Sequence, residues 1–423
     1  MIWNNMTIGV YGISSQSGLA YFTDFTNKGY RVIGYARSSK SGIESVDAIQ
    51  KAGGVTLERP QNSNHEESKF VPLSNSIVTN DAYILVNNAD VIILATPSIY
   101  QEDAVRELAQ VDSLLKRKVP IILSPSRTVA SPYLWRILGE HYPIVCFSTC
   151  PYSCKRPTPT TSVIKRRKRT WVSSLEGTFT QESIRTIKQL FPQAAITHIP
   201  ALTSLNNIGS VFHCATYLLN IDNIRKAEEE GRVFSFYMEG IAKRPEVGDI
   251  LEQIDQVRLQ IADKLGMSVF GLNSRPREDI WRKLTNGLRA LEAEHEDDIE
   301  ILRKIRRTFT EYLNNSVISA QHWLDITYGV IRIEGEPLSQ TIGRTPTYQS
   351  NSVPQLRYIE EDIPTGLVPM ESLAKYLNID CSIITSIIDK YISLYNRDIR
   401  ELGRNLNGFD MEDILNYLKN GIY

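Results

Sequence analysis

Short apolar runs alternate with amphipathic helical patterns over residues 1–202. The runs are rich in Val and Ile and lack polar alternation, which is typical of strands buried on both faces of a parallel sheet. They occupy residues 7–11, 30–34, 91–95, 120–124 and 144–147, with further strand-like residues at 170–173 and 195–196. Because helical segments separate them, they predict an α/β domain with a doubly wound parallel sheet.

Beyond residue 202 the apolar positions recur with the helical period of 3.6 residues. One stripe comprises Val247, Ile250, Leu251, Ile254, Val257 and Ile261, and similar stripes lie at 280–291, 299–313 and 373–391. Residues 327–369 are rich in Gly, Pro, Ser and Thr and predict an extended loop, which at this length is usually functional or disordered. The expected organisation is an α/β domain over 1–202 followed by a helical domain over 203–423.

Composition narrows the function classes. The chain has 423 residues, of which 42% are hydrophobic and 22% charged, with 47 Lys and Arg against 48 Asp and Glu. No global basic field is available to hold nucleic acid or an anionic membrane. The apolar runs are too short to span a bilayer, and no signal peptide is recognised, so a cytoplasmic protein is expected. Five cysteines fit reduced thiols better than a disulfide framework.

The first apolar run leads into a candidate nucleotide-binding loop. Its sequence places Gly12, Ser14 and Ser17 where a dinucleotide fingerprint has three glycines, with Ser15 between them. Gly12 permits a tight turn, and the small serines still permit close approach of phosphate to a helix N-terminus. An ordinary strand–turn–helix with one glycine is the alternative.

The end of the second apolar run bears on the choice of cofactor. An acidic residue would bind the ribose of NAD here, about 20 residues after the glycine loop, but this chain has Ala36 followed by Arg37, Ser38 and Lys40. Cations in place of a carboxylate suit the 2′-phosphate of NADP. The sequence therefore predicts NADPH as cofactor, with a solvated basic turn as the alternative.

Two further clusters are given structural interpretations. The basic run at 165–169 lies between two strand-like runs, so a solvated hairpin turn is favoured over a nucleic-acid site. Cys146, Cys150 and Cys154 lack zinc-type spacing and an adjacent histidine, so buried free thiols are favoured over a metal site. Residues 294–307 pass from acidic to basic and predict a solvated helix face, with a homodimer contact as the alternative.

Several motifs, in order along nearly the whole chain, resemble those of the octopine/nopaline (opine) dehydrogenase family. They are the segment 88–97, the Ser-Pro-Ser-Arg-Thr of 124–128, the segments 147–155 and 203–220, the aromatic-Glu-Gly of 236–240, and Arg-Tyr-Ile-Glu-Glu-Asp-Ile-Pro-Thr-Gly-Leu-Val-Pro at 357–369. The last motif is the most specific. The resemblance implies reductive condensation, through an imine, of an amine with a 2-oxo acid at the expense of NAD(P)H.

The resemblance also implies roles for individual residues. His213 would be the acid/base, Asp362 would orient its imidazole, and Arg357 would bind a substrate carboxylate. These types suit that chemistry, because imidazole exchanges protons near neutral pH and a guanidinium binds carboxylates in a fork. The family motifs further place Thr96 and Pro97 at the cofactor and Thr149, Tyr152 and Asn207 at the substrate.

Departures from the family pattern point to a subgroup. The fingerprint glycines are serines, Cys214 follows His213, and segment 334–354, with Arg344 and Tyr348, is longer than in invertebrate enzymes. The long segment, with Arg344 as a substrate-binding residue, predicts a larger amine pocket. Together with Arg37 and Lys40 it resembles bacterial enzymes that complete opine metallophores of the staphylopine, pseudopaline and yersinopine type. There the amine is nicotianamine-like and the oxo acid is pyruvate or 2-oxoglutarate.

Two other functions share the expected architecture. A 2-hydroxy-acid dehydrogenase of the ketopantoate or 6-phosphogluconate type would reduce an oxo acid without an amine. A non-catalytic NADPH-binding sensor would keep Arg37 but would have no use for His213, Asp362 and Arg357 together. Their joint presence favours an enzyme whose partners are small molecules.

Overall fold

The computed structural model describes all residues except 1–5, 59–67, 169, 271–315, 346–355 and 422–423. The chain divides into two compact units. The α/β unit contains the described residues up to Ser126 together with Ala130–His198, and the helical unit contains Arg127–Val129 and Ile199–Gly421. The division at 198/199 lies four residues before the expected one at 202/203. The chain therefore enters the helical unit twice, first for three residues only.

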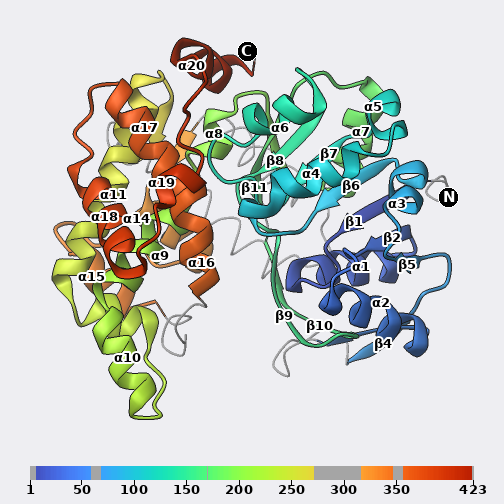
Figure 1. Ribbon diagram of the computed structural model, residues 1–423. Helices are drawn as coiled ribbons and strands as arrows, with labels where there is room; N and C mark the ends of the chain where they lie inside the picture. Colours follow the sequence, from blue (N-terminus) through green and yellow to red (C-terminus); the bar gives the residue numbers. More distant parts are fainter. Residues whose placement is uncertain (1–5, 59–67, 169, 271–315, 346–355, 422–423) are drawn as a thin grey trace, which may run out of the picture. The chain divides into compact units, whose positions relative to one another are not determined.

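An eight-stranded sheet forms the centre of the α/β unit (Figure 1). Its spatial order is β12 (Ala194–Thr197), β11 (Trp171–Glu176), β8 (Ile144–Phe147), β7 (Ile121–Leu123), β6 (Val91–Leu94), β1 (Thr7–Tyr11), β2 (Arg31–Tyr35) and β5 (Ile77–Thr79). All neighbours are parallel except β11, which runs antiparallel to β8. The predicted doubly wound sheet is confirmed.

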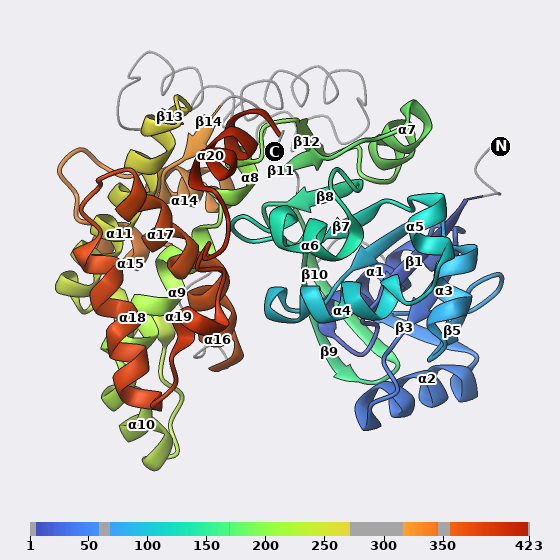
Figure 2. The same cartoon turned by 45° about the horizontal axis from the view of Figure 1, so that its top comes forward.

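Helices of the α/β unit begin at capping residues that the sequence supplies. Hydroxyl or carboxylate oxygens of Ser15, Ser39, Asp81 and Thr180 accept bonds from the first turns of four helices. These helices are α1 (Gln16–Asn27), α2 (Lys40–Ala52), α3 (Ala82–Asn88) and α7 (Gln181–Leu190), and the others are α4 (Gln101–Ala109), α5 (Ser113–Arg117) and α6 (Ser131–Leu138). Figure 2 shows the helices against the sheet from a second direction.

A second, four-stranded sheet was not predicted. It consists of β4 (Lys69–Pro72), β3 (Gly54–Glu58), β10 (Thr161–Arg167) and β9 (Tyr152–Thr158). The hairpin turn expected at 165–169 is therefore wrong, because most of the basic run continues strand β10. Ile164 is buried in that strand and Arg167 pairs with the buried Asp24, whereas Lys165 and Arg166 are exposed. Buried and more exposed residues alternate up to Lys165, and an irregularity in register between Ile164 and Arg166 coincides with the two consecutive exposed residues.

The helical unit is built around α9 (Ile208–Leu219) and α11 (Pro245–Lys264). The predicted stripe on α11 is confirmed, since Val247, Leu251, Ile254 and Ile261 are all buried. Among the described residues, the other elements are α8 (Ala201–Ser204), α10 (Ile221–Glu229), α14 (Ala320–Tyr328), α15 (Leu338–Gly343), α16 (Leu356–Asp362), α17 (Val368–Tyr376), α18 (Ser382–Tyr395), α19 (Ile399–Leu402), α20 (Met411–Asn420), π-helical turns at Met238–Ala242 and Ile363–Leu367, and the paired strands β13 (Ser268–Phe270) and β14 (Ser316–Ile318).

The extended loop expected over 327–369 is wrong for most of the described residues. Helices α15 and α16 and the π-helical turn occupy much of it. Glu336 holds the start of this region together by accepting bonds from Arg344 and Thr341. Tertiary contacts thus override a composition rich in Gly, Pro, Ser and Thr. The stripes expected at 280–291 and 299–313 and the helix face at 294–307 lie outside the described residues.

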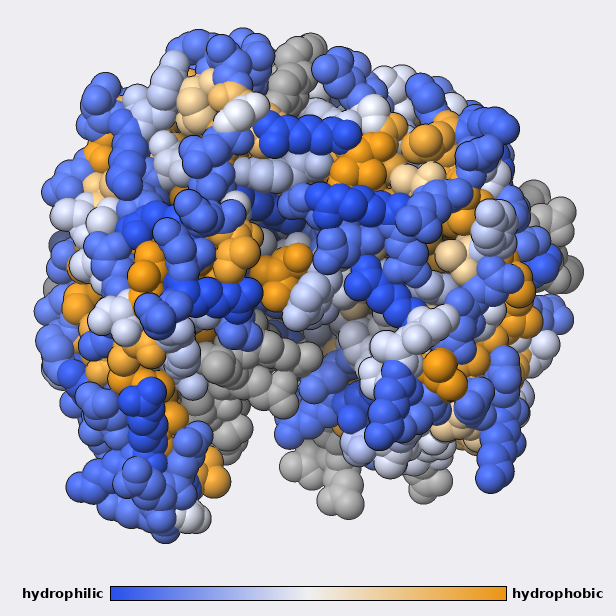
Figure 3. Space-filling model, viewed as in Figure 1, coloured by the Kyte–Doolittle hydropathy of each residue, from blue (hydrophilic) through white to orange (hydrophobic). Residues whose placement is uncertain are grey.

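The state of the cysteines and the polarity of the surface are those of an ordinary globular protein. All five cysteines are free, and Cys146, Cys214 and Cys381 are buried. Among the described residues, no helix combines the length and the apolar character needed to cross a membrane. Figure 3 shows a surface on which hydrophilic residues predominate and exposed apolar residues are scattered; helix α10, at the lower left, is largely hydrophilic.

Buried charge in the helical unit makes its stability depend on pH. The Glu371 side chain is buried on α17 and accepts bonds from Arg400 at 2.8 and 2.9 Å and from Thr385 at 2.6 Å. Burial alone would raise the pKa of Glu371, but the bonds from Arg400, Thr385 and Lys375 outweigh it and lower that pKa from 4.5 to about 2. A depressed carboxyl pKa stabilises the fold above the unfolded value and ceases to do so as the pH falls through the folded value.

We expect Glu371→Gln to lower the free energy of unfolding by about 2–3 kcal/mol at pH 7. The difference from wild type should shrink as the pH falls from 4.5 to about 2. Urea denaturation at several pH values measures this, with Glu102→Gln as a control, because the Glu102–Arg106 pair is exposed and should contribute little. A destabilisation by Glu371→Gln that does not change with pH would contradict the prediction.

Candidate functional site

A glycine turn lies at the carboxyl end of β1, where the order of the sheet reverses between β1 and β6. Gly12 adopts a φ of +97° there, and its N–H donates to the Tyr35 carbonyl at 2.8 Å. Ser15 begins helix α1 by accepting a bond from the Gly18 N–H at 2.9 Å. Doubly wound sheets bind nucleotides at such a reversal, and a helix N-terminus there favours phosphate.

Gly18 provides the close approach that the third fingerprint glycine usually provides. A Cβ on Gly18 would lie 2.0 Å from the Gly12 carbonyl oxygen and 2.5 Å from its carbon, so no other residue fits without moving backbone. The sequence motif places this position at Ser17, one residue too early. The glycine itself is plain in the sequence, but the usual motif spacing hides its role. Such close packing of the start of the helix against the end of the strand is the role of the third glycine in dinucleotide-binding loops.

Ser15 and Ser17 tie this loop to the neighbouring strand β6. Their hydroxyls donate to the Ala95 carbonyl at 2.7 and 3.3 Å, immediately before Thr96 and Pro97. The hydroxyls therefore fix the loop across the reversal point of the sheet. A role for these serines in cofactor binding would be exerted through the shape of the loop.

Arg37 follows β2 and pairs with Glu107 of α4, a residue that the sequence did not single out. The Arg37 Nε lies 2.8 Å from the Glu107 carboxylate, which also accepts bonds from the hydroxyls of Tyr11 and Tyr35. Burial, followed by the nearby carboxylate, raises the pKa of both tyrosines, so they remain neutral donors. The guanidinium lies 5.8 Å from the centre of the Tyr11 ring. Glu107 thus fixes one edge of Arg37.

The other residues predicted to bind the cofactor phosphate lie beside Arg37. Ser38 and Lys40 are exposed at the start of α2, and Ser39 caps that helix. Asn80 holds the preceding turn by donating to the Ala36 carbonyl at 2.8 Å. Two cations and a helix N-terminus therefore lie together, an arrangement that favours a phosphate.

Arg156 of β9 reaches the glycine loop from the second sheet. Its two terminal nitrogens donate to the Ser14 carbonyl at 2.7 Å and to the Ser45 hydroxyl at 2.8 Å. Burial lowers the pKa of Arg156, since neither contact is with a carboxylate. Because Ser14 and Arg156 are 142 positions apart, the sequence offers no local signal for this contact.

In the helical unit, His213 of α9 and Asp362 of α16 form a hydrogen-bonded pair. The His213 Nδ1 lies 2.7 Å from Oδ2 of Asp362. The His213 side chain is 21% exposed, whereas that of Asp362 is fully buried. The imidazole thus has access to solvent while its carboxylate partner does not. Such a pair can orient an imidazole for proton transfer.

Arg127 completes this cluster. The sequence motifs predicted no role for this residue. Its Nη1 lies 2.9 Å from Oδ1 of Asp362 and donates to the Asn207 side-chain oxygen at 2.9 Å, while Nε donates to Glu361 at 3.4 Å. Burial tends to raise the pKa of Asp362, but Arg127 and His213 outweigh it and lower that pKa. Asp362 is therefore ionised at neutral pH.

Hydrogen bonds to its own backbone groups hold the short segment Arg127–Val129 within the helical unit. The Thr128 N–H donates to the Thr365 carbonyl at 3.0 Å, and the Thr128 carbonyl accepts from Arg404 at 3.0 Å. The Ser204 hydroxyl accepts from the N–H of residue 129 at 3.1 Å. Residues 127 and 129 have φ values of +64° and +50°, which non-glycine residues rarely adopt. The surrounding bonds thus impose the conformation that delivers Arg127.

The residues predicted to bind the substrate do not form one cluster. Asn207 lies in the cluster with Arg127, but Tyr152 is buried in the α/β unit, where its hydroxyl donates to Asp24 at 2.7 Å. That placement favours a packing role for Tyr152 over the predicted substrate contact. The hydroxyl of Thr149 accepts a bond from Lys168.

Two basic residues, Arg344 and Arg357, were also predicted to bind the substrate. Arg344 pairs with Glu336, whose pKa it lowers to about 2, and also donates to the Ile331 carbonyl at 2.9 Å. Arg357 belongs to helix α16, but its side chain lies outside the described residues, as does Tyr348. Both substrate roles stay predictions.

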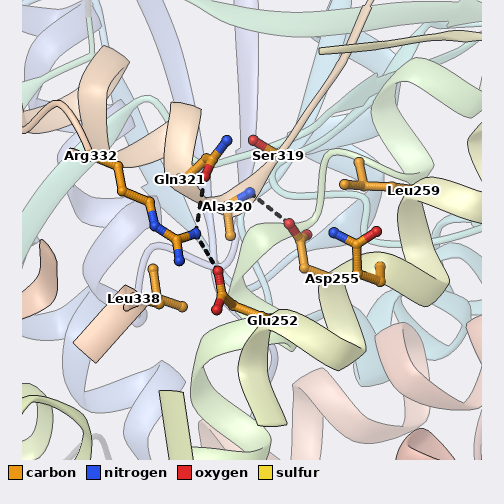
Figure 4. Close-up of a pocket in the computed structure, with 9 residues that line it drawn as sticks. Glu252, Asp255, Leu259, Ser319, Ala320, Gln321, Arg332 and Leu338 are labelled. Carbon is orange, nitrogen blue, oxygen red and sulfur yellow. Dashed lines mark hydrogen bonds and ion pairs between the residues drawn. The ribbon is translucent and has the colours of Figure 1, made fainter. Parts of the chain in front are cut away.

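A separate pocket lies between α11 and α14 (Figure 4). Arg332 bonds to Glu252 and Gln321 there, and Asp255 accepts from the Ala320 N–H at 2.9 Å. None of the predicted site residues lines this pocket. Within the described parts of the chain, no group of three or more His, Cys, Asp or Glu side chains could hold a metal ion.

Comparison with known proteins points to one enzyme family. Residues 200–393 match the family model for the α-helical domain of NAD/NADP octopine/nopaline dehydrogenase. The chain is also 24% identical over 410 residues to an opine dehydrogenase of Arthrobacter sp. (strain 1C), covering 95% of this chain and 94% of that one. Both matches support a place for this chain in the opine dehydrogenase family. It is an NAD(P)-dependent oxidoreductase of the class that acts on CH–NH bonds.

Solved structures of opine dehydrogenases share the fold. An octopine dehydrogenase solved with NADH and L-arginine has a TM-score of 0.69 at 15% identity, covering 97% of this chain and 98% of that one. A yersinopine dehydrogenase has a TM-score of 0.59 at 13% identity, covering 100% of this chain and 99% of that one. The predicted order of an α/β region followed by a helical region is thereby confirmed.

We expect Gly18→Ala to abolish tight dinucleotide binding in this protein. The added Cβ must displace the Gly12 carbonyl from 2.0 Å, which distorts the loop and should cost at least ~2 kcal/mol of stability. Titration of NADPH against protein fluorescence, together with thermal melting, measures both effects. Gly343→Ala is the matched control, because its Cβ would meet only Ala242 at 3.5 Å. Unchanged NADPH affinity in Gly18→Ala would refute the assignment of the loop.

Proposed function

We propose that this protein is an NADPH-dependent opine dehydrogenase of opine metallophore biosynthesis, which joins a large amine to pyruvate or 2-oxoglutarate. The observation that carries the proposal is the hydrogen bond of 2.7 Å between His213 and the buried carboxylate of Asp362. Proton transfer is needed at two stages of such a condensation. A positioned imidazole is suited to both.

His213 acts as the acid/base. The amine nitrogen attacks the carbonyl carbon of the oxo acid, water leaves, and the resulting C=N bond accepts a hydride at carbon and a proton at nitrogen. NADPH, when bound, supplies the hydride. Because Asp362 holds Nδ1 of His213, protons are exchanged at Nε2. Arg357 binds a substrate carboxylate, and Asn207 contributes to the same site.

Arg37 and Lys40 select NADPH by binding its 2′-phosphate beside the start of α2. The position that would carry a ribose-binding acid is Ala36, and the Glu107 ion pair presents Arg37 in a fixed orientation. Gly12, Ser14, Ser15 and Ser17 form the loop around the pyrophosphate, and Thr96 and Pro97 line the other side. A yersinopine dehydrogenase of similar fold, with a TM-score of 0.56, has been solved with NADP+ bound.

The segment 334–354 shapes the amine pocket, with Arg344 toward its carboxylates. Octopine dehydrogenase structures of similar fold hold L-arginine, agmatine or pyruvate. The longer segment in this chain favours a larger, multi-carboxylate amine derived from histidine.

Turnover with a panel of amines, each mixed with pyruvate, 2-oxoglutarate or glyoxylate and NADPH, tests the function by product mass. We expect a nicotianamine-like amine to give far more secondary amine than alanine or arginine, and His213→Ala to lower kcat by about 10²–10⁴-fold with unchanged melting temperature. His322→Ala, whose imidazole contacts Ser319 in the same unit, is the control.

Three outcomes would contradict this function. Reduction of the oxo acid without any amine indicates a 2-hydroxy-acid dehydrogenase of the ketopantoate type. NADPH binding without turnover of any pair indicates a sensor. Efficient formation of octopine or alanopine refutes the assignment of the amine.

Cofactor choice is tested by comparing wild type with Arg37→Ala. Wild type should have a higher kcat/KM with NADPH than with NADH, because a charge-assisted contact to the 2′-phosphate contributes about 1.5–3 kcal/mol to the binding of NADPH. Arg37→Ala should lose roughly 10–100-fold in NADPH affinity while its NADH affinity changes little. Arg106→Ala, an exposed arginine of α4 that pairs with Glu102 and Asp103, is the control. Equal kinetics with the two cofactors in wild type would refute NADPH selection.

A further inference from the structure

We propose that Arg127 is a positioning residue of the proton-transfer site, which fixes the Asp362 carboxylate so that this carboxylate in turn fixes the His213 imidazole. The inference rests on the proposed function, because it assigns a partner to the acid/base. Arg127 reaches the site from a segment of three residues that is otherwise surrounded in sequence by the α/β unit.

The two oxygens of Asp362 have separate partners. Oδ1 lies 2.9 Å from the Arg127 Nη1, and Oδ2 lies 2.7 Å from the His213 Nδ1. A carboxylate held at one oxygen alone could still rotate about its Cβ–Cγ bond. The ion pair at Oδ1 and the hydrogen bond at Oδ2 together restrict this rotation, and with it the direction in which the imidazole points.

Gly209 provides the space in which these three side chains meet. A Cβ at this position of α9 would lie 2.9 Å from the Arg127 Nη1 and 3.5 Å from both Oδ1 of Asp362 and Nδ1 of His213. The closest contact would thus be with the guanidinium. A glycine one helical turn before His213 therefore leaves room for Arg127 beside the His213–Asp362 pair.

The charges of the cluster balance when the imidazole is protonated. Arg127 and protonated His213 then carry two positive charges against those of Glu361 and Asp362. Cys214 is the other titratable group nearby, and burial, together with Asp362, raises the pKa of its thiol so that it stays neutral. Loss of Arg127 would leave two carboxylates against one imidazole, so the Asp362–His213 pair would bind its shared protons more tightly.

The test compares wild type, Arg127→Gln and Arg127→Lys in the full chain with its preferred substrates. We expect Arg127→Gln to lower kcat by about 10–100-fold, a part of what an acid/base supplies, with KM for NADPH unchanged. The pH profile of kcat should move to higher pH by about one unit or more, as for loss of a cation within 4–6 Å. Arg127→Lys should restore part of the wild-type pH profile, because the positive charge is kept. It should restore less of the wild-type kcat, because lysine lacks the forked guanidinium.

Arg400→Gln is the matched control. It removes an arginine of the same unit from the buried carboxylate of Glu371 and so lowers stability in a comparable way. Its pH profile should equal that of wild type. If Arg127→Gln lowers only the melting temperature, as Arg400→Gln does, Arg127 is structural and the inference is overturned.

Gly209→Ala gives a second route that leaves every charge in place. It should displace the guanidinium and lower kcat, and a full wild-type rate with a folded protein would count against the inference. A pH titration of the His213 imidazole by NMR needs no turnover. A midpoint moved upward in Arg127→Gln supports the inference even if no substrate is found, whereas an unmoved midpoint overturns it while leaving the proposed reaction intact.

Discussion

The buried ion pair between Arg127 and Asp362 constrains much of the helical unit. Removing two charges from water is costly, and their attraction compensates only where geometry is good and the remaining polar atoms are satisfied. Asn207 and Glu361 supply the further partners of Arg127, and backbone bonds hold its segment in an unusual conformation. Gly209 leaves the necessary space. Parts of the chain separated by more than 230 residues therefore have to meet within a few tenths of an ångström.

Much of the fold could be predicted because buried parallel strands leave a direct signal. The runs at 7–11 and 144–147 coincide with β1 and β8, since each has apolar residues on both faces. The region 327–369 misled for a physical reason. Its glycines and prolines disfavour isolated helices, yet packing against α9 and α11 stabilises α15, α16 and a π-helical turn that contains Pro364. Composition indicates only the local conformational preference of a segment, and in this region long-range contacts determine the secondary structure.

The candidate site was predictable only in part. His213 and Asp362 follow from motifs that resemble a family, and the structure brings them into contact. Arg127 lies within one of these motifs, but the motif does not show which residue it contacts, and Glu107 and Arg156 lie in none of them. Each of the three contacts a residue at least 70 positions away, and no periodicity links the partners. Gly18 was hidden for a simpler reason, since it lies one residue beyond the usual motif position.

The three residues Arg127–Val129 have a consequence for how such proteins can evolve. In many two-domain chains, a gene for one domain can be joined to another at a single crossing point. Here a fragment beginning at residue 199 would lack the backbone partners of Ser204, Thr365 and Arg404, as well as the cation beside Asp362. The helical unit is therefore not a portable module. Recombination that exchanges it must carry a piece of the nucleotide-binding half, so the two halves are inherited together.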